Sequence, residues 1–338
     1  MRKALYLALA ALTVISCGSR KSPARNMGSA QTSQMNQEQT AVDVPVFMAD
    51  SAYSYIAAQC AFGPRVPNTA AHKACAAWLE SKLKSLGTET IVQEYRTKTF
   101  DGTELNCFNI IGQINPECTS RIILCSHWDS RPWADNDPDP QNHKTPIDGA
   151  NDGASGVGVI LELARMIQQV PVSIGIDFMF FDAEDWGPGD DWTGRHKEEY
   201  WGLGTQYWAR HQHREGYRAR YAILLDMVGG KGARFPMEQY SVRYGKTAVD
   251  KVWDTAARLG YGQLFPKTDG YFVTDDHLFI NTIARIPAID IVPCVPASDG
   301  TSSFGPTWHT VSDNMGNIDP AVLKIVGQTL ATVIYSEK

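Results

Sequence analysis

Short, largely apolar runs recur along the chain after residue 100 and are separated by polar, glycine-rich stretches. Apolar character that is continuous over only four or five residues is typical of strands buried on both faces, as in a mainly parallel sheet. A strand with one face in water would instead alternate apolar and polar positions. The predicted strands are residues 108–111, 121–125, 177–181, 221–225 and 288–292.

Helical periodicity occupies most of the intervals between these runs. Residues 70–86 place apolar side chains at helical spacing, and Gly87 stands where such a helix would end. Asp319 is expected to cap a final helix that has Pro320 in its first turn. Alternating strands and helices indicate an α/β fold, a three-layer sandwich with a central, mostly parallel mixed sheet flanked by helices. The other predicted helices are residues 157–168, 204–211 and 247–259.

The N-terminal segment has the pattern of an export signal. A basic head at residues 1–3 precedes an apolar run at 4–15 that is too short to span a bilayer, so residues 1–16 predict a signal peptide. Small Ser16 directly before Cys17 resembles the bacterial lipobox, in which cleavage leaves the cysteine as the lipidated N-terminus. An ordinary signal peptide with an incidental cysteine is the alternative.

Two further regions follow this segment. Residues 17–41 begin with the lipidated cysteine and contain almost no large apolar side chain, which predicts a flexible tether. Residues 42–338 show no second break in composition and are long enough for a single catalytic α/β domain. The signal pattern and Cys17 predict an exported lipoprotein of the periplasm. Gly18 follows the cysteine in place of the aspartate that resembles an inner-membrane retention signal, and this resemblance implies anchoring to the outer membrane. We expect a monomer that meets the membrane through its lipid alone.

Composition narrows the classes of function. The formal charge is −6 and the Lys and Arg residues are dispersed, so the sequence does not predict a nucleic-acid partner. Six cysteines remain after Cys17, an even number for an exported protein, so disulfides are an option whose pairing the sequence does not define. None of the cysteines has the CxxC spacing of a thiolate metal site.

Ionisable residues follow three of the predicted strands at the point where each strand ends. They lie at residues 127–129, at 182–185 and at Asp226. A lone acidic residue in such a place is usually a helix cap or a turn former. Two more clusters, around Asp152 and His309, make a shared site the better interpretation, because the carboxyl ends of parallel strands meet at one edge of a sheet.

These clusters contain the ligand types of a catalytic zinc site. Such a site uses three nitrogen or oxygen ligands and leaves one position open for water or substrate. Asp152, Asp185 and His309 would satisfy that requirement. Glu184 directly precedes Asp185, so one turn could carry both a metal ligand and a proton carrier.

The clusters also form a series of motifs whose succession resembles the zinc aminopeptidase superfamily over nearly all of residues 50–338. Within that superfamily, TDDH (274–277) and FGPTWH (304–309) look like the glutaminyl cyclases, which convert N-terminal glutamine to pyroglutamate with release of ammonia. Asp185 stands where a metal-binding glutamate is the common choice, and this departure resembles the bacterial branch of the cyclases. The superfamily motifs are HWDS (127–130), GANDGASG (149–156), FFDAEDWG (180–187), LLDMVG (224–229) and TWHTVSDN (307–314).

The resemblance implies a role for each residue of the zinc site. It makes Asp152, Asp185 and His309 the ligands of one zinc ion per chain. It makes Glu184 the general acid and base. The implied substrates are peptides or proteins that begin with glutamine.

The resemblance also implies the surroundings of Glu184. Asp226 and Asp275 become partners in a hydrogen-bonded network around it, and their like charge is expected to raise its pKa. An aromatic pocket is implied for the glutamine side chain, with Trp186 as an alternative to its first member. The implied pocket residues are Trp192, Phe304 and Trp308.

An aminopeptidase with two zinc ions is the leading alternative, because all of its expected ligand positions carry suitable residues. Residues 274–277 and the aromatic side chains beside His309 favour the cyclase. A lipoprotein that binds peptides or glycans through an inactive enzyme fold is disfavoured, since no ligand is missing. The aminopeptidase ligands would be His127, Asp152, Asp185, Asp226 and His309, with Asp129 as an orienting residue.

Residues 135–139 alternate acidic side chains as calcium-binding loops do. The glycine and the terminal glutamate of an EF-hand are absent from this segment. We therefore expect a solvated loop.

Overall fold

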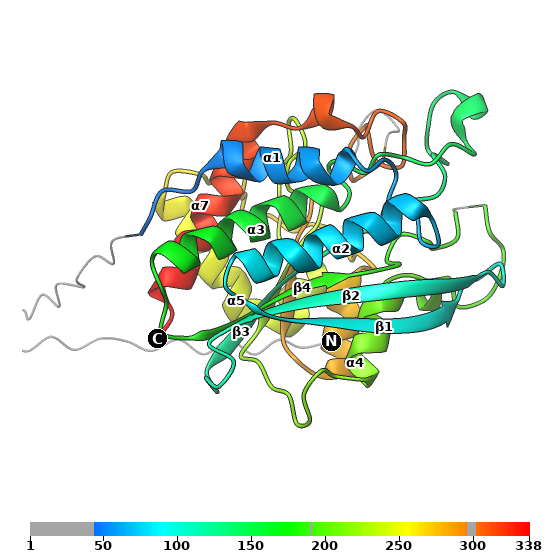
Figure 1. The fold of residues 1–338 in the computed structure, drawn as a ribbon. Helices are drawn as coiled ribbons and strands as arrows, with labels where there is room; N and C mark the ends of the chain where they lie inside the picture. The colour runs from blue at the N-terminus through cyan, green and yellow to red at the C-terminus, as the bar shows by residue number, and fades with distance from the viewer. Residues whose placement is uncertain (1–43, 190, 296–301) are drawn as a thin grey trace, which may run out of the picture. The chain divides into compact units, whose positions relative to one another are not determined.

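The computed structural model describes residues 44–189, 191–295 and 302–338. These residues form a mixed sheet with helices on both faces (Figure 1). The sheet has six strands in the order β1-β2-β4-β3-β5-β6. The predicted three-layer α/β sandwich is therefore confirmed. The strands are β1 (Glu89–Lys98), β2 (Glu104–Ile114), β3 (Arg121–His127), β4 (Gly175–Phe181), β5 (Ala222–Leu225) and β6 (Ala288–Ile291).

Strand direction divides the sheet into two parts. β4, β3, β5 and β6 run parallel and are buried throughout, as the continuous apolar runs predict. β2 is antiparallel to both of its neighbours, β1 and β4, so the run at 108–111 belongs to an antiparallel hairpin. β1 was not predicted, because its mostly polar residues are exposed or half-buried and carry no continuous apolar signal.

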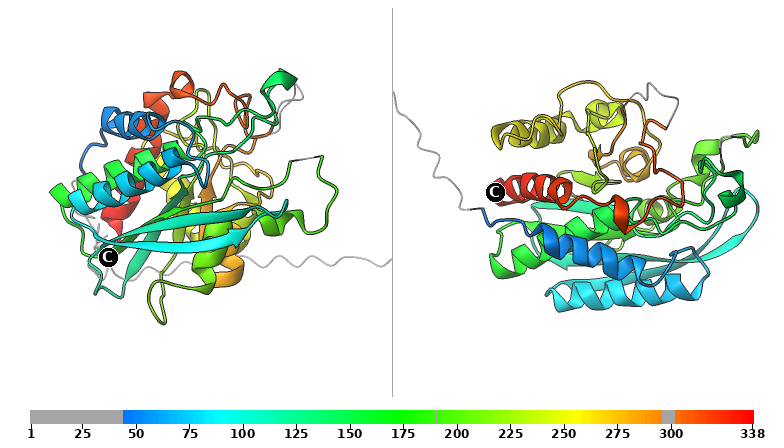
Figure 2. Two further views of the ribbon diagram at one scale, coloured as in Figure 1. Left: turned by 45° about the vertical axis from the view of Figure 1, so that its right-hand side comes forward. Right: turned by 90° about the horizontal axis from the view of Figure 1, so that it is seen from above.

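Helices cover both faces of this sheet, and more of them lie on one face than on the other. α2, α3, α5 and α7 lie over one face, and α1 packs on α3 and α7 (Figure 2). α4, α6 and the π-helical turn Ile280–Ala284 cover the other face. Thr69 caps α2 by accepting a hydrogen bond from the N–H of His72, and Asp319 caps α7 as predicted. The helices are α1 (Ala49–Cys60), α2 (Ala70–Ser85), α3 (Ala154–Gln169), α4 (Leu203–Arg210), α5 (Gln239–Arg258), α6 (Asp276–Phe279) and α7 (Pro320–Ser336), with 3-10 turns at Pro140–Asn142, Lys197–Tyr200 and Met315–Asn317.

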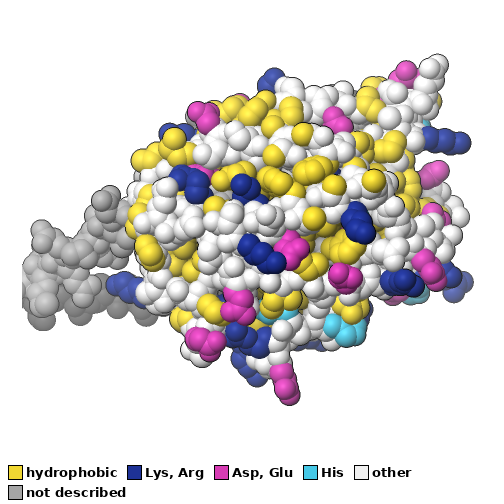
Figure 3. Space-filling model, viewed as in Figure 1, with side chains coloured by type: hydrophobic (Ala, Val, Ile, Leu, Met, Phe, Trp, Pro, Cys, Tyr) yellow, Lys and Arg dark blue, Asp and Glu magenta, His cyan; other side chains and the backbone are white. Residues whose placement is uncertain are grey.

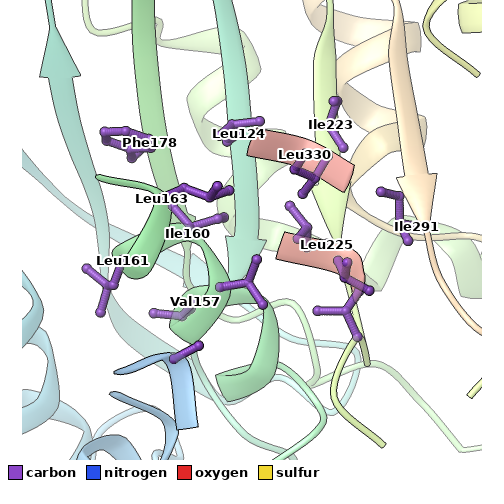
Figure 4. Packing of buried hydrophobic residues seen from close by; sticks show 14 of the residues in the cluster. Leu124, Val157, Ile160, Leu161, Leu163, Phe178, Ile223, Leu225, Ile291 and Leu330 are labelled. Atoms are coloured by element: carbon purple, nitrogen blue, oxygen red, sulfur yellow. The ribbon is translucent and has the colours of Figure 1, made fainter. Parts of the chain in front are cut away.

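The core consists of apolar layers on the two faces of the sheet. Leu124 of β3 and Ile223 of β5 belong to the same buried cluster as Ile160 of α3 (Figure 4). Ile123, the neighbour of Leu124, belongs to the cluster on the opposite face together with Trp208 of α4. This division follows from the alternation of side chains along a strand. The parallel strands are thereby clamped between helices, and their carboxyl ends form a fixed edge.

Three features of the described residues bear on the predictions from composition. Their six cysteines are all free, so none of the disulfides that the even number allowed is formed. On the face shown in Figure 3, Lys and Arg are interspersed with Asp and Glu. No helix within the described ranges is long and apolar enough to cross a membrane. The predicted signal peptide (1–16), Cys17 and the tether (17–41) lie outside the described residues.

Candidate active site

The carboxyl ends of the parallel strands carry the predicted site. β3 ends in His127, β4 leads directly into residues 182–185, and β5 leads into Asp226. Because these strands are parallel, their carboxyl ends lie at one edge of the sheet. Asp152 reaches this edge from the loop before α3, and His309 reaches it from the segment between β6 and α7. Five separate segments of the chain therefore meet here.

The predicted metal ligands Asp152, Asp185 and His309 form a buried cluster in which one ligand atom of each lies within 4.8 Å of the others. His309 Nε2 is 3.2 Å from Asp185 Oδ1 and 3.8 Å from Asp152 Oδ2. Asp185 Oδ2 is buried without a hydrogen-bond partner. An unsatisfied buried acceptor costs about 1–3 kcal/mol, and more if it is charged. Two carboxylates and one imidazole are ligands that zinc prefers, and the unsatisfied oxygen of Asp185 is free to bind the ion.

The backbone of this cluster is held by two further aspartates. Asp313 accepts a hydrogen bond from the N–H of Asp152 at 3.1 Å. Asp129 accepts hydrogen bonds from the N–H groups of Glu184 and Asp185 at 3.1 and 3.2 Å. These contacts fix the turns that carry the predicted ligands, as the supporting residues of metal sites commonly do.

His309 is oriented by Asp135, which the sequence assigned to a solvated loop. Asp135 Oδ1 lies 3.4 Å from His309 Nδ1, and the Arg131 guanidinium donates to both oxygens of Asp135 at 2.7 and 2.6 Å. Burial opposes ionisation of Asp135, but Arg131 and His309 outweigh it and lower its pKa. Asp137 is also buried and accepts a hydrogen bond from the N–H of Val311. The expectation of a solvated loop holds for Asp139, which is exposed, but not for Asp135 and Asp137, whose charges have tertiary partners.

We expect Asp135→Ala to weaken zinc binding by about 10- to 100-fold, since a metal-binding histidine that loses the acceptor on its other ring nitrogen is less basic and less well oriented. Competition with a chelator of known affinity measures this change. Asp139→Ala is the control, because Asp139 lies exposed in the same loop. Equal affinities of the two variants would contradict an orienting role for Asp135.

His127 lies between two carboxylates beside this cluster. Its Nε2 atom is 2.9 Å from Asp152 Oδ1 and 3.1 Å from Asp226 Oδ1. Burial alone would lower the pKa of His127, but hydrogen bonds with Asp129, Asp152 and Asp226 raise it well above the usual range. A side chain at Gly153 would come within 2.5 Å of the His127 ring, so only glycine fits there. His127, Asp152 and Asp226 form a second group with metal-ligand chemistry.

Glu184 is the buried acid next to the predicted ligands, with 7% of its surface exposed. Burial raises the pKa of Glu184 well above the usual range, Asp275 and Asp185 raise it further, and His127 opposes them. Burial is thus a larger cause than the like charges that the sequence suggested. Burial and the charge of a neighbouring carboxylate also raise the pKa of Asp226 to about 8. A carboxyl group with a pKa near neutrality is suited to accept and return a proton.

Asp275 approaches the site from the start of α6, where it accepts a hydrogen bond from the N–H of Asp276. His277 lies behind it, with Nε2 at 2.9 Å from Glu238 Oε2 and Nδ1 at 3.6 Å from Asp290 Oδ2. Both oxygens of Asp290 are buried without a hydrogen-bond partner, and burial raises the pKa of Asp290 well above its usual range. Asp275 is therefore the outermost member of a buried polar group.

Three non-glycine residues of the site have left-handed backbone conformations. They are Ala183, Met227 and His309, with φ values of 55°, 50° and 56°. Such conformations are sparsely populated and persist where surrounding structure enforces them, often at functional sites. Ala183 directly precedes Glu184, and Met227 directly follows Asp226. The backbone is thus constrained at or next to Glu184, Asp226 and His309, which fixes the directions of their side chains.

A cavity of about 250 Å³ opens over these acidic side chains. Phe304 and Trp308 line it as predicted, with their ring centroids 4.8 Å apart. Trp201, which the sequence did not single out, also lines it and stacks on the His309 ring at 6.1 Å. The predicted polar site residues that line this cavity are Asp152, Glu184, Asp185, Asp226, Asp275 and His309.

Trp192, which the resemblance assigns to the pocket, lies outside this lining. Its ring packs against Phe100 and Tyr200, with centroid distances of 5.7 and 5.6 Å. The alternative, Trp186, is also outside the lining and packs edge-on against Trp133 at 5.8 Å. Phe100 and Trp133 also contact each other, with ring centroids 6.1 Å apart, so both tryptophans belong to one aromatic group outside the cavity lining.

Trp201 occupies the cavity wall because of contacts that are not local in sequence. The N–H of Gly202 donates to the carbonyl oxygen of Glu184 at 3.2 Å, which brings the preceding Trp201 beside the turn that carries Glu184. A side chain at Gly187 would come within 2.0 Å of the Trp201 ring. In the sequence, the close contact of Trp201 with this turn is therefore marked by two glycines, Gly187 and Gly202.

Most of the chain, including all the segments that form this site, resembles proteins that are already known. The model of peptidase family M28 matches residues 109–334. A glutaminyl cyclase of Bacteroides thetaiotaomicron, solved with N-acetylhistamine, is 52% identical with a TM-score of 0.85, and a leucine aminopeptidase precursor from the same organism is 52% identical with a TM-score of 0.84; each match covers 88% of this chain and 100% of the other. The glutaminyl-peptide cyclotransferase of Gloydius blomhoffii is 23% identical over 302 residues, which are 80% of this chain and 76% of that protein. The resemblance inferred from the motifs is confirmed: this chain belongs to peptidase family M28, in the group that contains the bacterial glutaminyl cyclases.

Proposed function

We propose that this chain is a zinc-dependent glutaminyl-peptide cyclotransferase, which converts the N-terminal glutamine of peptides and proteins to pyroglutamate and releases ammonia. The observation that carries this proposal is the position of Glu184. It is a buried acid with a raised pKa, and it shares one small cavity with three zinc-type ligands and an aromatic wall. The cyclases among the relatives of this chain support the same reaction.

The proposed metal site holds one zinc ion per chain on Asp152, Asp185 and His309. Zinc bound there supplies a Lewis acid for the amide oxygen of the substrate. The three side chains come from separate loops, and each loop is held by hydrogen bonds within the protein. A ligand set that is fixed in this way needs little rearrangement when it binds the ion.

The proposed reaction closes a ring within the substrate. The α-amine nitrogen attacks the γ-carboxamide carbon and forms the ring C–N bond, and the bond between that carbon and the side-chain nitrogen breaks. Both groups belong to one residue, so the substrate itself supplies most of the proximity. Glu184 accepts the proton that the amine loses and delivers it to the departing nitrogen, which leaves as ammonia.

The surroundings of Glu184 support this exchange of a proton. Burial and the nearby charge of Asp275 raise the pKa of Glu184, which makes this carboxyl group a better base for the amine proton than an exposed glutamate. Phe304, Trp308 and Trp201 provide apolar walls for the two methylene groups of glutamine. These apolar walls limit the access of water to the side-chain amide, where water would otherwise compete with the amine.

Mass measurement after incubation with a glutamine-initiated peptide tests the proposal. Cyclisation shortens no peptide and removes one ammonia, whereas a peptidase removes a residue. A peptide that begins with alanine is the control, because it has no side-chain amide to cyclise. Release of the first residue from both peptides, without loss of ammonia, would refute the cyclase function.

An aminopeptidase is the second candidate, and one observation favours it. His127, Asp152 and Asp226 form a further ligand group that shares Asp152 with the first, which is the arrangement that a pair of bridged metal ions requires. The similarity to the leucine aminopeptidase precursor points the same way. The same peptide assay separates the two candidates.

We also propose that the enzyme is a monomeric lipoprotein, tethered by residues 17–41 and anchored through Cys17 to the outer membrane, facing the periplasm. The support is the basic, apolar and small-residue pattern that precedes this cysteine. We expect Cys17→Ser to move the protein from the membrane fraction to the soluble fraction of its native cell envelope. Immunodetection in the two fractions measures this, and membrane retention of the variant would contradict lipid anchoring.

A further inference from the structure

The cavity over the predicted metal ligands has room for little more than one residue. Its volume is about 250 Å³, which is below the about 300–1,000 Å³ of pockets that enclose drug-sized ligands. A peptide whose first residue fills this space has its second residue at the rim. Selection among peptides that all begin with glutamine must therefore take place at the rim.

Phe272 stands at this rim, in the segment before Asp275. Its side chain lines the cavity and is nevertheless 60% exposed. A single exposed apolar side chain is common on protein surfaces and indicates nothing by itself. Phe272 differs from an isolated exposed side chain in two ways. It is part of the cavity lining, and its ring packs against the Tyr240 ring at a centroid distance of 4.8 Å.

The backbone on both sides of Phe272 is fixed. The carbonyl oxygen of Tyr271 accepts a hydrogen bond from the N–H of Gln239 at 2.9 Å, and the N–H of Val273 donates to Glu238 Oε1 at 3.0 Å. Val273 is buried, and Glu238 is fully buried at the start of α5. The ring of Phe272 is thus presented to solvent by a rigid segment, and a ligand that covers it need not order a flexible loop.

We propose that Phe272 is a specificity residue that contacts the side chain following the N-terminal glutamine and selects apolar, above all aromatic, residues at that position. This inference rests on the proposed cyclase function. An apolar second side chain removes the exposed ring from water, and an aromatic one adds a favourable ring pair. Glycine leaves the ring exposed, and a charged side chain loses hydration when it is placed against it.

Three substrates separate the effects of the first and second residues: glutamine amide, Gln-Gly amide and Gln-Phe amide. We expect the full chain to have a kcat/KM about tenfold higher for Gln-Phe amide than for Gln-Gly amide. Phe272→Ala should bring this ratio close to one by raising KM for Gln-Phe amide, with kcat unchanged, because a contact remote from the reacting atoms acts equally on the ground and transition states. The loss for glutamine amide, which has no second side chain, should be smaller than the loss for Gln-Phe amide.

Tyr271→Ala is the matched control, because this neighbouring side chain is 48% exposed but does not line the cavity. It should keep the preference for Gln-Phe amide, and Phe272→Leu should keep part of it. The assignment is overturned if Phe272→Ala retains the full preference, or if it loses activity on all three substrates by the same factor. An unsubstituted protein that releases ammonia from none of them fails the proposed function itself, and the specificity role fails with it.

Discussion

We expect Glu184→Gln to lower kcat for cyclisation by about 10²- to 10⁴-fold while the zinc content of the protein stays unchanged. Glutamine has nearly the same shape as glutamate, so a site that is 7% exposed can accommodate it without repacking. It cannot take a proton from the substrate amine and return it to the leaving nitrogen. The side chain is not a member of the Asp152, Asp185 and His309 cluster, so the ligands are retained.

Single-turnover kinetics and metal analysis of the same preparation measure the two parts of this prediction. Glu199→Gln is a suitable control, because that side chain is 72% exposed and lies outside the cavity lining. Full activity of Glu184→Gln would remove it from the proton transfer. Loss of zinc from this variant would instead make Glu184 a ligand and change the assignment of the whole site.

Removal of zinc with a chelator should lower activity by about 10³-fold or more, since a Lewis acid contributes several kcal/mol to the stabilisation of developing charge. We expect one equivalent of zinc per chain to restore the full rate. The structural reason is that Asp152, Asp185 and His309 form a buried ligand cluster that lines the cavity and has an unsatisfied oxygen on Asp185. Activity measured against added zinc, together with metal analysis, provides the stoichiometry.

Asp226→Asn distinguishes one metal ion from two. In the one-zinc site Asp226 is a neighbour of Glu184, so the variant should keep its zinc and lose turnover. In the aminopeptidase alternative Asp226 is a ligand beside His127, so the variant should lose one of two ions. A requirement for two equivalents in the unsubstituted protein would contradict the one-zinc proposal.

The parallel part of the sheet was predictable because its signal is local. Each of the runs at 121–125, 177–181, 221–225 and 288–292 is buried on both faces, and burial on both faces favours apolar side chains at most positions. The run at 108–111 has the same character but pairs antiparallel, since strand direction depends on the connections and not on the composition of the strand. β1 was missed for a different reason: its mostly polar, exposed or half-buried residues carry no continuous apolar signal.

The aromatic wall illustrates a different limit. The resemblance assigned Trp192 to the pocket, with Trp186 as the alternative, whereas Trp201 lines the cavity in the structure. That choice depends on the backbone contact between Gly202 and Glu184 and on the missing side chain of Gly187. Neither contact is encoded in a periodic pattern.

The amino-acid sequence by itself determined the α/β class, the strands of the parallel core and the order of motifs that carries the ligand types, because apolar periodicity and short motifs act over a few residues. The tertiary structure alone decided that Asp135 orients His309 and that Trp201 and Phe272 complete the cavity. These arrangements arise where segments far apart in the chain meet at one edge of the sheet. Such meetings depend on hydrogen bonds and close packing between distant residues, which no local pattern records.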